Sequence, residues 1–155
     1  MNQHTTPFTK SGFEKLKKEL EELISKRPYA VKTLSRAREM GDLSENGLYK
    51  AAKFELGQLD RNITHLKRLI KSANVSIPTN NNIVQIGHMV EIRSEQQKLS
   101  YFLVGEFEAD PKERKISNKS PIGYALMGKK TGDIVTINTP NKKLTYEIIS
   151  ISPAP

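Results

Sequence analysis

The chain has 155 residues and a formal net charge of +8, and it contains no cysteine. This length suits one ordinary domain or two small ones. The absence of cysteine excludes disulfides and thiolate metal sites and is typical of the reducing cytoplasm. The N-terminus lacks a secretory pattern, and no apolar run approaches the roughly eighteen residues of a membrane span. We therefore expect a cytoplasmic protein without a membrane partner.

Most of the excess positive charge lies in the first half of the chain. The first 80 residues hold 15 basic and 9 acidic side chains, a net of +6, whereas the remainder carries +2. A basic surface favours a polyanionic partner, most often nucleic acid. The same composition also suits an ordinary solvated helix face, because Lys and Glu are good helix formers. Charge alone leaves both interpretations open.

Two long stretches before residue 77 have the periodicity of amphipathic helices. Their apolar residues recur every three or four positions, which places them on one stripe of each helix. The stripes are Phe13, Leu16, Leu20 and Leu23, and then Leu56, Leu59, Ile63, Leu66, Ile70 and Ala73. Two such helices pack as an antiparallel coiled-coil hairpin, and a helix of nearly thirty residues is about 40 Å long.

Local signals predict where these helices begin and end. Thr9 and Ser11 both suit a helix start, and Ser11 with Glu14 matches a capping box. Pro28 removes a backbone donor and clashes one turn back, which predicts a kink or a brief break. The second helix is predicted from about Asn46 to Ala73.

An acidic turn, with Asp42 and Glu45, separates the two helices. Asp-x-x-Glu is a capping box, and both charges would suit the positive end of the second helix, so spacing alone favours a capping role. Alternatively, the pair completes the shell of a Mg²⁺ ion that has other ligands, because this ion is often held by one or two carboxylates with phosphate and water. Two carboxylates would not retain the ion alone. We therefore expect no cofactor of the protein's own.

The second part of the chain has a different periodicity. A polar, turn-rich run at 78–82 predicts a linker between a hairpin at 1–77 and a domain at 83–155. Ser120, Pro121 and Gly128 predict the cap, first residue and end of one short helix. The alternating strands are predicted near 84–86, 89–92, 101–104, 134–137 and 144–149. The predicted class is α+β, with a helical hairpin followed by a small antiparallel sheet and one short helix.

The residues of common catalytic sites are mostly absent. His4, His65 and His88 fall on different predicted elements, so they suggest neither a metal cluster nor a triad. The sequence has no phosphate-binding glycine loop and no thiol nucleophile. We therefore expect an accessory protein rather than an enzyme, with any remaining active-site groups supplied by a partner.

Three segments resemble the bacterial Gre transcript cleavage factors, and they resemble GreA more closely than GreB. The first runs from Phe13 to Pro28, the second from Ala37 to Lys53 across the acidic turn, and the third from Ile116 to Asp133. Together they span nearly the whole chain in the order of the family. The resemblance implies a second domain with an FKBP-like fold.

The resemblance also implies a partner and a role for each segment. The second domain would dock at the rim of the secondary channel of bacterial RNA polymerase, and the hairpin would enter that channel. Asp42 and Glu45 match the acids that help to hold the polymerase's second Mg²⁺ and position the attacking water. The polymerase's own endonuclease would then cut the 3′ end of a backtracked transcript. The docking residues implied by the resemblance are Ser120, Pro121, Ile122 and Gly123.

Further residues near the turn match family positions. Arg38 and Lys53 would contact the displaced RNA 3′ end, although an ordinary solvated charge explains them too. Ser44 and Asn46 would support the tip, and the protein would act as a monomer. Gly47 departs from the usual alanine, and a glycine in the first helical turn costs up to about 1 kcal/mol.

Three alternatives remain open from the sequence. A hairpin that enters the channel without promoting cleavage would modulate or inhibit the polymerase. A prolyl isomerase would share the FKBP-like fold, but fold alone does not carry function. A free-standing DNA-binding protein is disfavoured, because no base-reading motif is visible. The aromatic residues of this domain that could line an isomerase pocket are Tyr101, Phe102, Phe107, Tyr124 and Tyr146.

Overall fold

The computed structural model describes residues 5–41 and 46–154. The chain divides into two compact units: one is Glu14–Ser72, and the other combines Met1–Phe13 with Ala73–Pro155. The predicted division at 77 and 83 stays a prediction, because spatial clustering does not test which segments fold independently. Among the described residues, no helix is long and apolar enough to cross a membrane.

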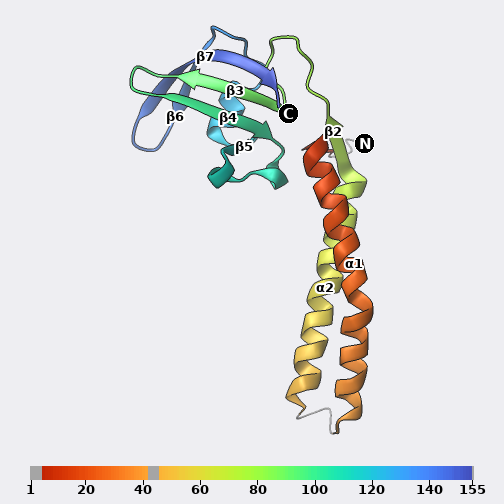
Figure 1. Cartoon of the computed structure of the whole chain (residues 1–155). Coiled ribbons are helices and arrows are strands. Elements are labelled where there is room, and N and C mark those ends of the chain that lie inside the picture. Colours follow the sequence, from red (N-terminus) through yellow and green to blue (C-terminus); the bar gives the residue numbers. More distant parts are fainter. Residues whose placement is uncertain (1–4, 42–45, 155) are drawn as a thin grey trace. The chain divides into compact units, whose positions relative to one another are not determined.

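The unit Glu14–Ser72 is a helical hairpin, as predicted (Figure 1). Helix α1 spans Lys10–Glu39 and helix α2 spans Gly47–Ser72, and the two run antiparallel. Burial of one stripe from each helix stabilises the pair, because apolar side chains leave water along the contact. The buried positions are Leu16 and Ala37 on α1 and Ala52, Ile63, Leu66 and Leu69 on α2.

Helix α1 continues through Pro28, so the predicted break is wrong. Proline leaves the carbonyl of residue 24 without its helical donor. Ile24 is 44% exposed and Pro28 is exposed as well. Water can therefore satisfy that carbonyl, and the helix loses one hydrogen bond without ending.

An ion pair joins the two helices beside Pro28. Arg27 donates from Nε to Asp60 Oδ1 over 2.7 Å and from Nη2 to Asp60 Oδ2 over 3.2 Å. This hydrogen bonding holds the pKa of Asp60 below its usual value. The pair therefore stabilises the hairpin at neutral pH and loses this effect as pH falls through the lowered pKa. Both side chains are nearly half exposed, so the contribution is small.

The other unit is built on a five-stranded sheet in the order β5-β4-β3-β7-β6 (Figure 1). The strands are β3 His88–Arg93, β4 Lys98–Val104, β5 Lys115–Ser117, β6 Ile134–Asn138 and β7 Lys143–Pro153. All neighbours are antiparallel except β4 and β5, which are parallel, so the prediction of a purely antiparallel sheet is wrong at this edge. Strand β5 has three residues, too few for an alternating pattern to show.

The prediction of a strand at 84–86 is also wrong, because this segment does not join the sheet. Its neighbour Ile83 forms an isolated bridge with Lys130. Val84 donates its amide to the carbonyl oxygen of Lys129 and accepts from the amide of Gly128, so it pairs with the segment after α3 and not with a strand. Val84 and Ile86 are nevertheless buried, at 1% and 6% exposed. The apolar alternation therefore marked burial correctly, but the segment lies outside the sheet.

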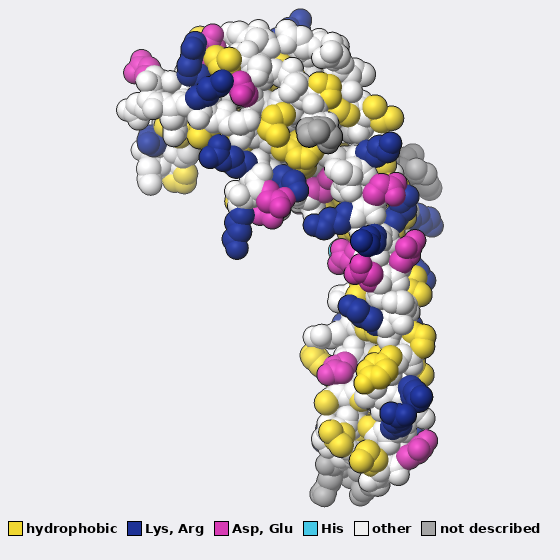
Figure 2. Space-filling model, viewed as in Figure 1, with side chains coloured by type: hydrophobic (Ala, Val, Ile, Leu, Met, Phe, Trp, Pro, Cys, Tyr) yellow, Lys and Arg dark blue, Asp and Glu magenta, His cyan; other side chains and the backbone are white. Residues whose placement is uncertain are grey.

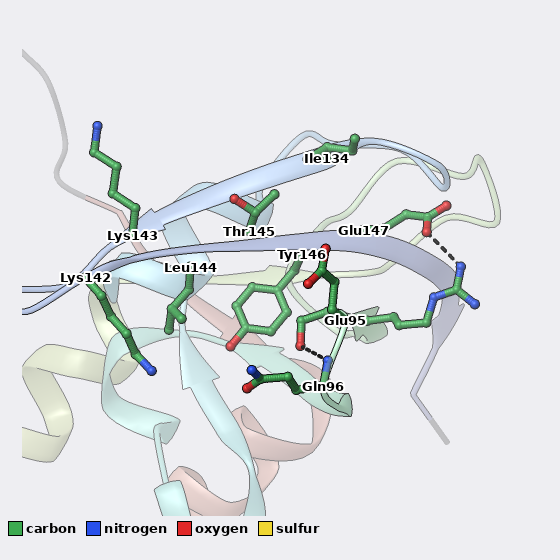
Figure 3. Close-up of a pocket in the computed structure, with 11 residues that line it drawn as sticks. Glu95, Gln96, Ile134, Lys142, Lys143, Leu144, Thr145, Tyr146 and Glu147 are labelled. Atoms are coloured by element: carbon green, nitrogen blue, oxygen red, sulfur yellow. Dashed lines mark hydrogen bonds and ion pairs between the residues drawn. The ribbon is translucent and has the colours of Figure 1, made fainter.

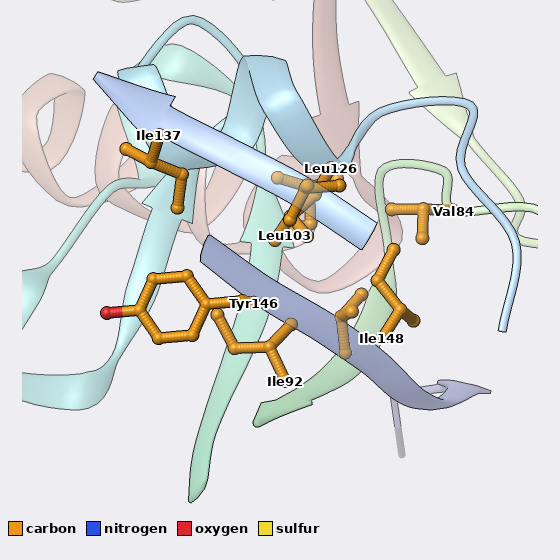
Figure 4. Close-up of a cluster of buried hydrophobic side chains, with 9 residues drawn as sticks. Val84, Ile92, Leu103, Leu126, Ile137, Tyr146 and Ile148 are labelled. Carbon is orange, nitrogen blue, oxygen red and sulfur yellow. The ribbon is translucent and has the colours of Figure 1, made fainter. Parts of the chain in front are cut away.

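The short helix α3, Pro121–Leu126, closes the core of this unit (Figure 4). Ser120 Oγ accepts a hydrogen bond from the amide of Gly123 over 3.1 Å, and Gly128 follows the helix with φ of +74°. The predicted cap, first residue and end are thus confirmed. Leu126 from α3 packs with strand residues, and the whole buried cluster is Val84, Val90, Ile92, Leu103, Leu126, Val135, Ile137, Tyr146 and Ile148.

The predicted linker is fastened to the sheet unit through buried His88, which is 1% exposed. Its Nδ1 accepts from the amide of Gln85 over 3.0 Å, and its Nε2 lies 3.0 Å from the carbonyl oxygen of Thr79. A neutral ring with the proton on Nε2 satisfies both contacts. The ring therefore ties residues 79–88 into one hydrogen-bonded loop.

A second, two-stranded sheet was not predicted. Strand β1, Thr6–Thr9, pairs in parallel with strand β2, Ala73–Ser76. Phe8 in β1 is 1% exposed and stacks on Phe107, with the ring centroids 6.3 Å apart. Residues predicted to belong with the hairpin are thereby packed against the η1 turn, Glu106–Glu108.

The start of α1 is capped by two residues that lie far apart in the sequence. Thr9 Oγ1 accepts from the amide of Gly12 over 3.0 Å, so Thr9 is the cap and the predicted Ser11–Glu14 capping box is wrong. Glu108 instead accepts from the amide of Thr9 over 2.9 Å and from the Thr9 hydroxyl. This is the role that a glutamate three residues after the cap has in a local capping box.

Replacing Glu108 with alanine should lower the free energy of unfolding by about 1–3 kcal/mol, because the buried amide of Thr9 then loses its acceptor. Glu106→Ala is the matched control, since Glu106 is exposed and pairs only with Lys119 in the described contacts. It should cost under about 1 kcal/mol. Urea titration compares the two, and equal costs would contradict the distant cap.

Candidate site at the end of the helical hairpin

The candidate site surrounds the turn between α1 and α2. Asp42, Ser44 and Glu45 lie outside the described residues, so their arrangement stays a prediction. Arg38 lies in the last turn of α1, and Lys53 lies in the second turn of α2, and both are exposed. The flanking residues therefore carry the structural description of the site.

Asn46 joins the two helix ends through its side-chain amide. Its Oδ1 accepts from the amide of Tyr49 over 3.1 Å, which makes it the N-cap of α2. Its Nδ2 donates to the carbonyl oxygen of Ala37 over 2.7 Å. Helix ends leave such donors and acceptors without intrahelical partners. One side chain therefore caps α2 and adds a second hydrogen bond to the Ala37 carbonyl, which also accepts from the amide of Met40, and so it holds the two helix ends together.

This cap weakens the structural explanation of the two acids. A capping box formed by Asp42 and Glu45 would place the N-cap of the second helix at 42 and its third residue at 45. Helix α2 begins at Gly47 instead, and its cap is Asn46. The cap of α2 is therefore Asn46 and not Asp42, and the role of the two carboxylates stays a prediction.

An aromatic residue lies beside the two predicted RNA-binding cations. The Arg38 guanidinium carbon lies over the Tyr49 ring, 5.9 Å from its centroid, which is within the range of a cation–π contact. Tyr49 and Lys53 are four residues apart on α2 and share one helix face. Arg38 and Lys53 were both predicted from the sequence as RNA contacts, whereas Tyr49 was assigned no role. The four-residue spacing between Tyr49 and Lys53 was the available signal.

The surface near the turn is mixed in character. Met40 is 69% exposed and Leu48 is 62% exposed, and both border a shallow groove of about 320 Å³ between α1 and α2. Figure 2 shows hydrophobic side chains lying among basic and acidic ones along the face of the hairpin that it draws. Gly47 is the first residue of α2, and a Cβ added there would meet no atom within 4 Å. Its helix-weakening effect is thus confined to the first position of the helix.

The four predicted docking residues lie together on and before α3, but they have different environments. Pro121 is exposed, whereas Ile122 is half-buried and packs against the core. Ser120 caps the helix. Gly123 is buried, and a Cβ on it would lie 2.0 Å from the carbonyl oxygen of Ser117. Three of the four therefore have a clear structural role, whereas Tyr124, which was not among the predicted docking residues, is 79% exposed.

An open depression of about 640 Å³ lies on the sheet unit (Figure 3). Its lining is largely polar and charged, and an ion pair joins Arg93 Nη2 to Glu147 Oε2 over 2.8 Å. Of the five aromatic residues considered for an isomerase, Tyr146 alone lines this depression, and it is 5% exposed within the core cluster. This depression is therefore not the aromatic-lined pocket that the isomerase alternative requires.

The comparison with known families covers both parts of the chain. Residues 6–75 match the family described as "Transcription elongation factor, N-terminal", and residues 79–153 match "Transcription elongation factor, GreA/GreB, C-term". The chain belongs to the GreA/GreB family of transcription elongation factors. The family resemblance predicted from three sequence segments is confirmed, and this Gre factor is of the GreA type.

Individual relatives of this Gre factor match along most of their length. Transcription elongation factor GreA of Thermodesulfovibrio yellowstonii is 44% identical over 152 residues, covering 94% of this chain and 96% of the relative. GreA of Staphylococcus saprophyticus is 42% identical over 156 residues, covering 97% and 98%. Among solved structures, the GreA factor homolog 1 of Thermus thermophilus is 28% identical, with coverage of 96% and 99% and a TM-score of 0.45.

Replacing Asn46 of this Gre factor with alanine should lower the free energy of unfolding by about 0.5–2 kcal/mol, the usual cost of losing an N-cap. Asn46→Asp is the informative partner variant, because aspartate caps equally well but cannot donate to Ala37. Urea titration of the three proteins separates the cap from the bond between the helices. An aspartate variant as stable as the wild type would show that the Ala37 bond contributes little.

Proposed function

We propose that this Gre factor binds bacterial RNA polymerase, inserts the α1–α2 hairpin into the secondary channel and stimulates the polymerase's own cleavage of the RNA 3′ end in backtracked complexes. The observation that supports it most directly is the cap of α2. Because Asn46 fills that position, Asp42 and Glu45 are not needed there and are available as ligands. Family membership supplies the transcriptional context.

The donor set of the turn suits a shared Mg²⁺ ion. Asp42 and Glu45 are carboxylates, which this ion accepts as hard oxygen ligands, and two of them fill only part of an octahedral shell. Polymerase groups, RNA phosphate and water would complete it. A second ion at such a site neutralises charge on the attacking and leaving oxygens of the phosphodiester. This chain's contribution is two anionic ligands and a rigid helical support, so it acts as an accessory factor.

The cations beside the turn fit the same proposal. Arg38 and Lys53 are exposed, and both can contact the phosphates of an RNA 3′ strand displaced into the channel. The sheet unit would dock at the channel rim through α3, whose exposed residues are Pro121 and Tyr124. One protomer supplies all of these parts, which agrees with action as a monomer.

The test adds the purified full-length protein to a stalled, backtracked elongation complex with RNA labelled at its 5′ end. The expected result is a shortened labelled RNA that the polymerase can extend again when nucleotides are restored. The double variant D42N/E45Q is the matched control, because it keeps side-chain size and removes both charges. If the wild-type protein binds the complex but leaves the RNA intact, the alternative of a non-cleaving channel modulator replaces this proposal.

A further inference from the structure

Asn46 fixes the backbone on both sides of the contact between Arg38 and Tyr49. Asn46 bonds to the carbonyl of Ala37, the residue before Arg38, and to the amide of Tyr49 itself. The backbones that carry the guanidinium and the ring are therefore fixed relative to each other. Arg38 Cζ lies 5.9 Å from the centroid of the Tyr49 ring. The cation and the ring form a preorganised pair at the end of the hairpin.

Tyr49 lies at the margin of the hairpin's apolar contact. The buried positions of α2 are Ala52, Ile63, Leu66 and Leu69, whereas Tyr49 keeps more of its surface exposed. A residue needed only for helix packing would gain more from complete burial. Tyr49 is therefore partly accessible beside the Arg38 guanidinium, as a residue that contacts an aromatic ligand must be.

The chemistry of the group matches one class of ligand. Proteins bind single-stranded nucleic acid by stacking its bases on aromatic rings and guanidinium planes, with cations along the backbone. Tyr49 and Arg38 supply the ring and the guanidinium, and Lys53 supplies a further cation one helical turn from the ring. If Arg38 and Lys53 were only solvated surface charges, neither would need an aromatic ring beside it.

We propose that Tyr49 and Arg38 form a stacking platform for a base of the displaced RNA 3′ strand, with Lys53 contacting an adjacent phosphate. This rests on the proposed function, because RNA reaches the hairpin only inside the polymerase complex. The platform would hold the displaced strand while the acids of the turn help to hold the Mg²⁺ ion at which the polymerase cleaves the RNA. Tyr49 is thus a positioning residue for the RNA rather than a ligand of the metal ion.

The test compares full-length wild type, Tyr49→Phe and Tyr49→Leu on backtracked complexes whose displaced nucleotide either carries its base or is abasic. Stacking is worth about five- to a hundredfold per base. Tyr49→Leu should therefore slow cleavage of the normal RNA by this factor, while Tyr49→Phe, which keeps the ring, should stay near wild type. On abasic RNA the three proteins should stimulate cleavage to similar rates.

A second measurement does not depend on the rate or on any variant. RNA with 5-iodouridine as the displaced base, irradiated in the wild-type complex, should crosslink to Tyr49, and peptide mass spectrometry locates the attachment. An equal loss for Tyr49→Leu on normal and abasic RNA, or a crosslink elsewhere on the hairpin, would overturn the platform. Failure of the wild type to stimulate cleavage of any RNA would overturn the proposed function itself, so the two failures are distinguishable.

Discussion

Replacing Asp42 with asparagine, or Glu45 with glutamine, should reduce stimulated transcript cleavage by about tenfold or more. Each substitution keeps the side-chain size but removes the charge that a Mg²⁺ ligand supplies. A loss of about 1.36 kcal/mol of transition-state stabilisation lowers the rate tenfold. The fold should persist, because Asn46 caps α2 without either acid. Binding to the polymerase should therefore be nearly unchanged.

The measurement is the cleavage rate of one backtracked complex as a function of Mg²⁺ concentration. Raised Mg²⁺ should partly restore the weaker variant, because mass action then compensates for a weakened ligand set. Competition with labelled wild-type protein checks that both variants still occupy the polymerase. Near-normal cleavage by both variants would return Asp42 and Glu45 to a purely structural role.

Replacing Gly123 with alanine should destabilise the sheet unit by about 1–3 kcal/mol or more, the usual cost of overpacking. The added Cβ would lie 2.0 Å from the backbone carbonyl oxygen of Ser117, so the start of α3 would have to move. Docking on the polymerase should then weaken because α3 is displaced. The thermal midpoint of unfolding should fall in parallel with the affinity.

Tyr124→Ser is the matched control for Gly123. Its side chain is 79% exposed, so the substitution should change the free energy of unfolding by less than about 0.5 kcal/mol. If α3 is the docking surface, the same substitution should weaken competition for the polymerase. A Gly123→Ala protein with wild-type stability but no polymerase binding would instead make Gly123 a direct contact.

Much of the candidate site was visible in the sequence because its signals are local. The hairpin followed from residues three and four positions apart, which meet on one helix face whatever lies elsewhere in the chain. Ser120, Pro121 and Gly128 marked α3 for the same reason, since caps act within one turn. Family motifs then selected Asp42 and Glu45, whose spacing alone had suggested a cap.

The tertiary structure was needed to identify which residue caps α2, Asp42 or Asn46. Asn46 reaches Ala37 across the turn, and no periodicity encodes a bond between the end of one helix and the start of the next. The Arg38–Tyr49 contact was hidden for the same reason. The exposure of each residue of α3 also came only from the structure. It distinguishes Gly123, which packs against Ser117, from Tyr124, which faces solvent.

By itself, the sequence determined the three helices, the strands β3, β4, β6 and β7, the place of the hairpin and the family of the protein, because helix stripes, strand alternation, caps and motifs depend on neighbouring residues. The tertiary structure alone decided the partners of short or distant segments. Strand β5 pairs in parallel with β4, β1 pairs with β2, and Glu108 caps α1 from 99 residues away. Such contacts form between segments that are distant in the sequence. A three-residue strand or a single carboxylate has no repeating pattern, so its distant partner cannot be predicted from the sequence.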